Sequence, residues 1–225
     1  TGVCRPVGSP GEPRARWEHD PLRDKDAVMA MPDSELMQLA IDAADNARTR
    51  TAPNPWVGCA IYSASGSVYV GATEPPGQAH AEIVALNAAG SQAAGAVLAT
   101  TLEPCAHTGR TGPCTEAIVN AGVRRVVVGI EDPDDNVAGA GIAQLRAAGI
   151  EVGVGVRADE ITAQLAPYLH HRRTGRPYVI LKLAATVDGR TAAPDGKSEW
   201  VTGVVARTDV HQMRAESQAI LVGAG

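Results

Sequence analysis

The sequence contains no phenylalanine, and aromatic residues make up only 3% of its 225 residues. Valine, isoleucine, leucine and alanine must therefore fill any hydrophobic core. No apolar run approaches the roughly 20 residues that a membrane-spanning helix requires, so we expect no membrane insertion. The first thirty residues also lack the apolar stretch of a secretory signal, which predicts a cytoplasmic protein.

Positive charge is scarce, because 20 lysines and arginines face 25 aspartates and glutamates, for a net charge of −5. A protein that binds a polynucleotide needs a basic surface to neutralise its phosphates. We therefore expect a small-molecule substrate and no nucleic acid. Cysteine is scarce as well, with four residues. In a cytoplasmic chain these are more often metal ligands, nucleophiles or reduced core residues than a disulfide framework.

The chain is long enough for one full domain and part or all of a second, and its hydrophobic content of 44% is ordinary for a globular protein. Residues 1–32 are rich in proline, glycine and charge without apolar periodicity, which predicts a disordered tail. Residues 33–173 carry the pattern of an α/β domain. A hinge follows at the Thr-Gly-Arg-Pro sequence, and residues 174–225 predict the opening of a second α/β domain.

Strands and helices alternate along the first of these domains. A helix begins at Asp33 or Ser34 and ends before Thr51. Two strands then form a hairpin, and three further apolar strands separated by helices predict a mostly parallel sheet covered on both faces, a three-layer α/β sandwich. The expected strands are 56–62, 68–72, 97–102, 125–130 and 150–156, and the expected helices are 79–89, 113–121, 141–148 and 158–173. In the second domain we expect strands over 178–185 and 219–222 around a helix over 204–215.

Three candidate metal ligands stand where predicted strands end and helices begin. His80 opens one helix, Cys105 follows a strand after Pro104, and Cys114 opens another helix. The carboxyl ends of strands in an open α/β sheet are where ligands bind. Two thiolates and one imidazole match the tetrahedral N/S ligation of zinc, and a helix N-terminus is expected to lower the pKa of Cys114 and, with it, that of Cys105.

Three protein ligands leave the fourth zinc position to water, whose pKa the metal lowers to roughly 7. Glu82 lies two residues from His80, near the metal without binding it. It is therefore the candidate general acid and base. Zinc deaminases that act on bases carry an H-x-E sequence followed by P-C-x-x-C. Here eight residues separate the cysteines, and this longer loop contains His107 and Arg110, polar groups suited to hold a substrate or its phosphate.

Other readings of the same residues remain open. A His-x-Glu pair or a Pro-Cys pair alone has little value as a signal, and Cys59 in its apolar strand is read as a reduced core thiol. A zinc deaminase that acts on guanine, cytidine or a tRNA adenosine is one alternative. A zinc-stabilised binding module without turnover is another, and it requires a fourth protein ligand, for which Cys59 or His107 is the candidate.

The segment from Thr101 to Cys114 closely resembles the zinc loop of the bifunctional riboflavin-biosynthesis deaminase/reductase family. The resemblance runs from about residue 34 to the end of the chain. Other segments that carry it are residues 54–58 (NPWVG), 79–82 (AHAE), 132–133 (DP), 137–139 (VAG), 173–177 (RTGRP), 181–190 (LKLAATVDGR) and 198–200 (SEW).

This resemblance implies a cytidine-deaminase-like domain that converts a diaminopyrimidinone bearing a ribosylamino 5′-phosphate into the corresponding aminouracil. It also implies a dihydrofolate-reductase-like domain that uses NADPH to reduce the ribose, and association into a homo-oligomer. By position, the resemblance assigns zinc to His80, Cys105 and Cys114, proton transfer to Glu82, and deaminase substrate contacts to Asn54, His107, Arg110 and Asp132. It assigns cofactor contacts to Lys182, Ala184 and Trp200, and reductase substrate contacts to Ser198 and Arg214.

Two positions depart from the family pattern. Asp134 stands where many members have asparagine, and its charge is expected to repel a phosphate unless Asn136 or a neighbouring arginine compensates. Thr73 stands where a substrate-facing histidine is common. The chain also stops before the remaining strands and the glycine-rich segment of the reductase, so we do not expect these residues alone to perform the reduction. Without the resemblance, Lys182 and Trp200 would be read as surface and packing residues.

Overall fold

A computed structural model describes residues 31–107, 112–135, 137–197 and 200–223 of the chain. Most of the tail expected over residues 1–32 therefore lies outside the described residues. The same holds for two candidate substrate contacts, Arg110 and Ser198, and for Asn136.

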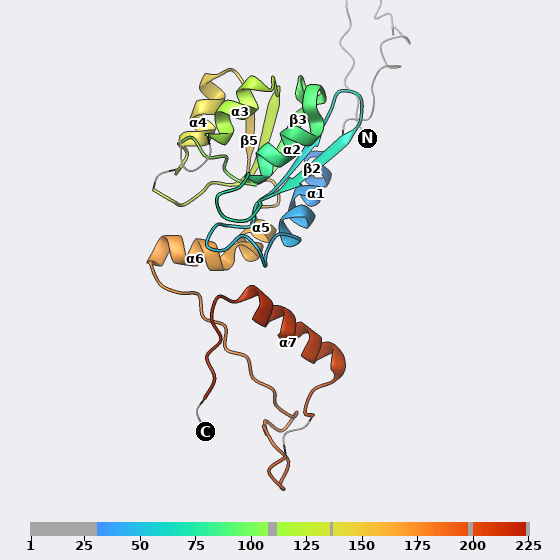
Figure 1. Cartoon of the computed structure of the whole chain (residues 1–225), viewed down its shortest axis with the longest axis vertical. Helices are drawn as coiled ribbons and strands as arrows, with labels where there is room; N and C mark the ends of the chain where they lie inside the picture. Colours follow the sequence, from blue (N-terminus) through green and yellow to red (C-terminus); the bar gives the residue numbers. More distant parts are fainter. Residues whose placement is uncertain (1–30, 108–111, 136, 198–199, 224–225) are drawn as a thin grey trace, which may run out of the picture. The chain divides into compact units, whose positions relative to one another are not determined.

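A five-stranded sheet in the order β2-β1-β3-β4-β5 forms the centre of the first domain (Figure 1). Its strands are β1 (Gly58–Tyr62), β2 (Val68–Ala72), β3 (Val97–Leu102), β4 (Arg125–Ile130) and β5 (Glu151–Val154). β1 pairs antiparallel with both β2 and β3, whereas β3, β4 and β5 are parallel. The sheet is thus mixed, and the expectation of a mostly parallel sheet was wrong, because the hairpin adds two antiparallel pairings to the three parallel strands.

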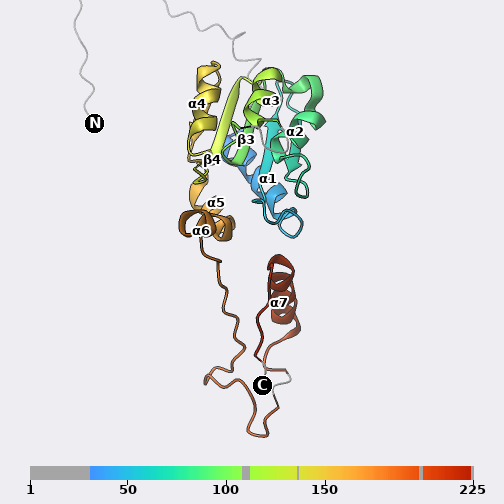
Figure 2. The ribbon, with the colours of Figure 1, turned by 60° about the vertical axis from the view of Figure 1, so that its left-hand side comes forward.

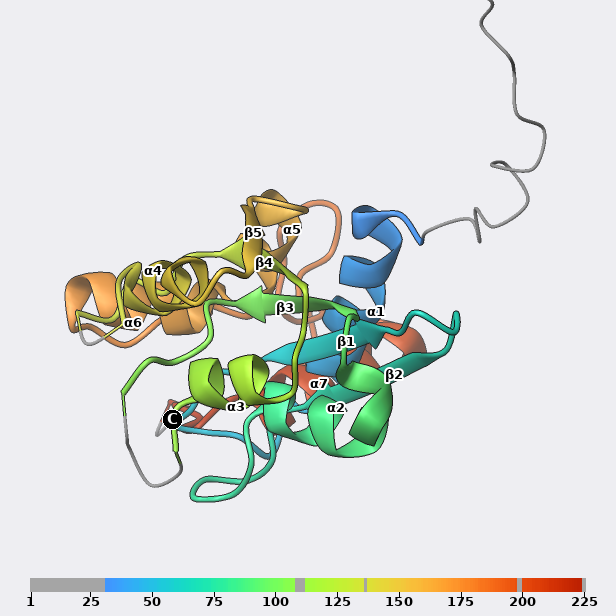
Figure 3. The same ribbon diagram turned by 90° about the horizontal axis from the view of Figure 1, so that it is seen from above.

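Helices cover both faces of this sheet. They are α1 (Asp33–Asp45), α2 (Ala81–Ala89), a 3₁₀ turn η1 (Gly90–Ala93), α3 (Cys114–Asn120), α4 (Ala140–Ala147), α5 (Ala158–Gln164) and α6 (Ala166–Thr174). α1 packs on β1 and β3 and α5 on β4, on the face opposite α2 and α3 (Figure 3). α4 contacts α3 and β5, and Figure 2 shows it at the β4 side of the sheet. The expected three-layer sandwich is confirmed.

Small aliphatic side chains fill the core, as the lack of phenylalanine predicts. All six residues of the central strand β3 are buried, including Thr100 and Thr101, as expected for a strand covered on both faces. The largest fully buried side chains of the described core include Leu36, Met37, Ile61, Leu98, Ile118 and Val127. Residues from both helical layers and the sheet therefore form one cluster around which the domain folds.

The helix expected over residues 158–173 is divided into α5 and α6. The break falls at Leu165, and Pro167 lies in the first turn of α6. Proline has no N–H to continue the hydrogen-bond ladder but is well accommodated at a helix start. The prediction of one continuous helix was wrong at this position.

The described part of residues 175–223 contains one regular element, helix α7 (Val204–Glu216). The strands expected over 178–185 and 219–222 are not formed among the described residues, which is a further correction. Val179 and Leu181 are each 81% exposed. An isolated apolar segment cannot satisfy its backbone groups as a strand without a neighbour to pair with. Within the described residues, no helix combines the length and apolar character needed to cross a bilayer.

Candidate active site

The candidate site lies where β3 and β4 end and where α2, α3 and α4 begin. Because β3 and β4 are parallel, with Leu102 opposite Ile130, the segments that follow them leave the sheet at the same edge. His80 is the N-cap residue of α2, and Cys114 is the first residue of α3. Gly71 of β2 lets α2 approach the sheet closely, because a Cβ there would lie 2.4 Å from the Ala81 carbonyl oxygen.

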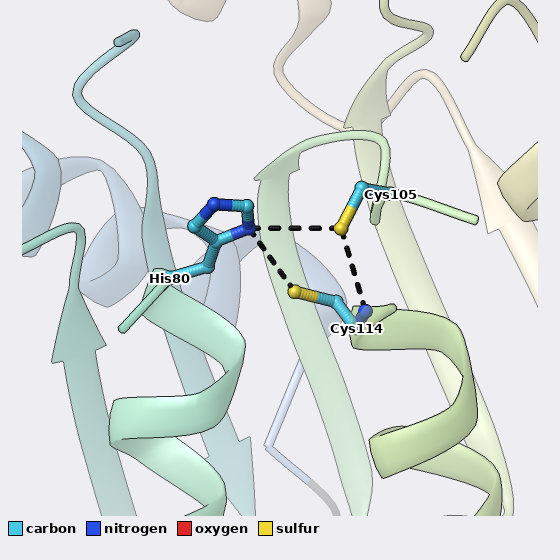
Figure 4. A group of neighbouring side chains, drawn as sticks. All are labelled: His80, Cys105 and Cys114. Atoms are coloured by element: carbon cyan, nitrogen blue, oxygen red, sulfur yellow. Dashed lines mark hydrogen bonds between the residues drawn. The ribbon is translucent and has the colours of Figure 1, made fainter. Parts of the chain in front are cut away.

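His80, Cys105 and Cys114 meet at this edge with their ligand atoms within 4.8 Å of one another. Nδ1 of His80 lies 3.3 Å from Sγ of Cys114 and 3.6 Å from Sγ of Cys105 (Figure 4). One imidazole nitrogen therefore faces both sulfurs. A single nitrogen and two sulfurs converging on one point fit the donor preference of zinc.

The two thiols of this cluster differ in acidity because of their hydrogen bonds. The thiol of Cys114, and then the imidazole of His80 and the Cys114 N–H, lower the pKa of Cys105 to about 4. The Cys114 N–H at the start of α3 donates to Sγ of Cys105 at 3.4 Å. The adjacent Cys105 sulfur raises the pKa of Cys114. The lowered pKa expected for Cys105 is thus found, whereas the pKa of Cys114 is raised and not lowered as expected. A bound dication would favour both thiolates.

Glu82 lies in the first turn of α2 and is only 3% exposed. Burial raises the pKa of its carboxyl to about 7, while the imidazole of His80 acts in the opposite direction. A carboxyl group with a pKa near neutrality can both accept and donate protons at that pH. Its position beside the ligand cluster is therefore suited to proton transfer.

A cavity of about 380 Å³ opens beside the cluster. Six of the residues singled out from the sequence line it, namely Asn54, His80, Glu82, Cys105, His107 and Asp132. Cys114 is fully buried behind them. Thr73 also lines the cavity, but its hydroxyl is hydrogen-bonded to the backbone N–H and carbonyl of Val57. The structure therefore brings the described candidates of the deaminase half together around one cavity.

The reductase-half candidates are not part of this cavity. Lys182, Trp200 and Arg214 are exposed, and Ala184 is half-buried. None of the four lines the cavity. Their assigned roles stay predictions.

Glu103 belongs to the Thr101–Cys114 segment, but the sequence analysis assigned it no role. Its buried carboxylate accepts four backbone N–H groups, from Asp132, Gly139, Gly141 and Ile142, at 2.9–3.2 Å. It thereby joins the end of β3 to the start of α4 and to the segment after β4. Gly141 permits this contact, because a Cβ there would lie 2.0 Å from the Pro104 carbonyl oxygen. Its place directly before Pro104 and Cys105 was the signal in the sequence.

Tyr168 and Arg172 of α6 also line the cavity and were not identified from the sequence. The hydroxyl of Tyr168 donates to both carboxylate oxygens of Asp132, at 2.9 and 3.0 Å. Burial raises the pKa of Asp132. Arg172 forms an ion pair with Asp134 at 3.2 Å. Asp132 and Asp134, which follow β4, are therefore both contacted by one helix that is distant in sequence.

The fourth protein ligand required by a closed structural zinc site is not found in the described part of the chain. The cluster contains three ligands there. Cys59 is fully buried inside β1, and His107 is exposed at the cavity. Neither belongs to the cluster, so the described geometry favours a site with a coordination position open to the cavity.

Comparisons with known proteins agree with this geometry. Residues 31–130 match the family model "Cytidine and deoxycytidylate deaminase zinc-binding region", and residues 177–225 match the "RibD C-terminal domain". The chain is 47% identical over 189 residues to the riboflavin biosynthesis protein RibD of Bacillus amyloliquefaciens, which covers 84% of this chain and 51% of that protein. It is 46% identical to RibD of Escherichia coli over 191 residues, covering 85% of this chain and 52% of that protein.

Solved structures of RibD proteins are also similar to this chain. RibD of Acinetobacter baumannii is 47% identical with a TM-score of 0.75, covering 82% of this chain and 52% of that one. A diaminohydroxyphosphoribosylaminopyrimidine deaminase/5-amino-6-(5-phosphoribosylamino)uracil reductase from Thermotoga maritima is 37% identical with a TM-score of 0.76, covering 81% and 52%. The chain thus spans about half the length of the curated relatives it matches. It is a homologue of the RibD proteins that comprises the deaminase zinc-binding region and the start of the RibD C-terminal domain.

Proposed function

We propose that this chain catalyses the zinc-dependent hydrolytic deamination of 2,5-diamino-6-ribosylamino-4(3H)-pyrimidinone 5′-phosphate to 5-amino-6-ribosylaminouracil 5′-phosphate in riboflavin biosynthesis. The observation that carries the proposal is the cluster of His80, Cys105 and Cys114 beside a cavity that the buried Glu82 also lines. The T. maritima relative, whose name specifies such a deaminase, supports the choice of substrate.

The three zinc ligands and Glu82 have separate parts in the proposed reaction. His80, Cys105 and Cys114 would hold the zinc ion, which supplies the Lewis acidity that activates a water molecule near neutral pH. Glu82 accepts a proton from that water, protonates a ring nitrogen and later delivers a proton to the departing amino group. The water oxygen replaces the amino group on the ring, and ammonia leaves.

Substrate recognition is proposed for the polar residues of the cavity wall. Asn54, His107 and Asp132 line the cavity and would bind the pyrimidine and the sugar. The hydrogen bonds from Tyr168 hold the Asp132 carboxylate in one orientation, so it can act as a fixed acceptor for ring N–H groups. Arg110, which lies outside the described residues, is proposed to bind the substrate phosphate.

The reductase activity belongs to the proposal only for a protein with a complete C-terminal domain. There Lys182, Ala184 and Trp200 would contact NADPH, and Ser198 and Arg214 would contact the ribosyl substrate. We also propose a homo-oligomer in the cytoplasm. The three described cysteines are free, and zinc thiolates persist best in a reducing compartment.

The first prediction tests the proposed chemistry through Glu82→Gln. This substitution removes the titratable group but keeps its size, so we expect turnover to fall by at least about a hundredfold. The assay is ammonia release together with the ultraviolet change of the diaminopyrimidine phosphate, and the zinc content should stay at one ion per chain. Unchanged activity would remove Glu82 from the mechanism. Guanine and cytidine serve as competing substrates, and faster turnover of either would contradict the proposed substrate.

A further inference from the structure

We propose that Arg172 binds the anionic group of the substrate and thereby determines specificity for a phosphate monoester. The inference rests on the proposed function, because it concerns the same cavity. It assigns a role to a residue of α6 whose guanidinium lies at the wall of that cavity.

Acidic residues outnumber basic ones in the described lining of the cavity. Its described lining includes four acidic residues, Glu82, Glu103, Asp132 and Asp134. Among the described lining residues, Arg172 is the only lysine or arginine. A cavity with this excess of acidic groups repels an anion unless a cation is placed where the negative charge of the ligand arrives. Arg172 is the described residue that meets this need.

The neighbours of Arg172 hold it in place. Its guanidinium lies 3.2 Å from a carboxylate oxygen of Asp134 and 5.3 Å from the ring centre of Tyr168. Tyr168 in turn donates to Asp132, whose Oδ1 accepts the backbone N–H of Asp134 at 3.0 Å. These four residues form a closed ring of contacts. The group proposed to bind the pyrimidine and the group proposed to bind the anion are therefore held in one arrangement.

The ion pair with Arg172 also offsets the repulsion expected between the Asp134 carboxylate and a substrate phosphate. The sequence analysis required Asn136 or a neighbouring arginine to offset Asp134, and Arg172 is such an arginine. A guanidinium carries five N–H donors in a planar fork, so it can pair with a carboxylate and a phosphate at the same time. The Arg172 side chain is 39% exposed and that of Asp134 17%, which leaves the guanidinium the more accessible of the two.

A purely structural role does not account for the pair. An ion pair in which the arginine is this exposed contributes little to stability, because water screens it and the side chain loses freedom. Its place among the residues that line the cavity allows it to meet a ligand of opposite charge.

The test compares Arg172→Met with a matched control, Arg173→Met, an exposed arginine of the same helix that does not line the cavity. Each variant is assayed on the phosphorylated substrate and on its dephosphorylated form. We expect Arg172→Met to raise KM for the phosphorylated substrate about tenfold or more, with kcat within about twofold, and to leave KM for the dephosphorylated form unchanged. Arg173→Met should match the wild type on both.

A second readout does not depend on turnover. Ribose 5-phosphate binding, measured by calorimetry, should weaken to a similar extent in Arg172→Met and only slightly in Arg172→Lys, which keeps the charge. Equal losses on both substrates, or ribose 5-phosphate affinity equal to that of Arg173→Met, would overturn the proposal. If the wild type binds ribose 5-phosphate through Arg172 but releases no ammonia, the proposed function fails while the role of Arg172 stands.

Discussion

At the scale of single residues, the site depends on buried groups whose partners come from several elements. Glu103 is the clearest case, since one carboxylate serves four N–H groups and lies between the metal ligand Cys105 and the end of β3. Its role is to hold the site in shape and not to react.

Glu103→Gln provides a prediction at this scale. The amide places an NH₂ group where the carboxylate accepts N–H groups, so at least one buried donor loses its acceptor. We expect the free energy of unfolding to fall by about 2–3 kcal/mol, measured by urea denaturation. Glu116→Gln, on the exposed face of α3, is the control and should change stability by less than about 0.5 kcal/mol. Equal stability of the two variants would show that the four hydrogen bonds matter little.

Sequence reasoning at this scale identified groups whose chemistry is intrinsic to the residue. Imidazole and thiol groups bind metals wherever they meet, so the spacing of His80, Cys105 and Cys114 was informative without a structure. Tyr168 and Arg172 were missed, and Glu103 was given no role, because glutamate, tyrosine and arginine occur on most surfaces. Their importance comes from burial and from partners distant in the chain, as with Tyr168 and Asp132.

At the scale of elements, an ion-pair network fixes the start of α1 to the sheet. Arg125 of β4 donates to both carboxylate oxygens of Asp33, at 2.6 and 2.7 Å, and to Glu151 of β5 at 2.8 Å. The hydrogen bonds from Arg125 lower the pKa of Asp33 below its usual value. The first turn of α1 is thereby held against β4.

This network predicts a pH dependence of stability. The folded-state pKa of Asp33 is below its unfolded value, so the ion pair stabilises the fold fully above the unfolded pKa of about 3.9. The contribution is lost as the pH falls through the folded pKa. In Asp33→Asn, the free energy of unfolding should be lower at pH 7 and should decline less steeply below about pH 4 than in the wild type. Glu35→Gln, an exposed acid of the same first turn, is the control. Parallel pH profiles of Asp33→Asn and wild type would contradict the prediction.

The elements themselves were largely predictable, since all five strands and the helices from α1 to α4 lie within a few residues of their expected positions. Hydrophobic periodicity is a local property, and it was sufficient there. It failed for the strands expected over 178–185 and 219–222, because a strand exists only where a neighbour pairs with it. Hydrophobic periodicity also does not predict that β1 pairs antiparallel with β3, because this contact joins distant segments.

At the scale of the whole molecule, the metal cluster links parts of the domain that are far apart in the chain. His80 begins α2, Cys105 follows β3, and Cys114 begins α3. A zinc ion shared by the three would tie two helices and a strand end together. Metal that binds the folded state and not the unfolded one stabilises it by mass action.

We therefore predict that removal of zinc with a chelator lowers the Tm of the wild type and abolishes ammonia release, and that added zinc restores both. At a free metal concentration of 1,000 times Kd, the stabilisation is about 4 kcal/mol. Cys114→Ser should bind less metal and show a smaller chelator effect. Cys59→Ser is not a suitable control because it buries a hydroxyl, whereas Cys59→Ala tests that this thiol is no ligand and should retain one zinc ion per chain. A full metal content after chelation and dialysis, or none in the untreated protein, would contradict the assignment.

The sequence by itself determined the order of elements in the first domain, the metal-ligand set and the resemblance to the deaminase/reductase family. These follow from residue chemistry and short-range periodicity, which do not depend on the rest of the fold. Only the tertiary structure decided the mixed pairing of the sheet, the capping of α4 by Glu103 and the contact of Arg172 with Asp134. Each of these joins residues distant in the chain, and the free energy of such contacts depends on burial and geometry that arise only when the chain has folded.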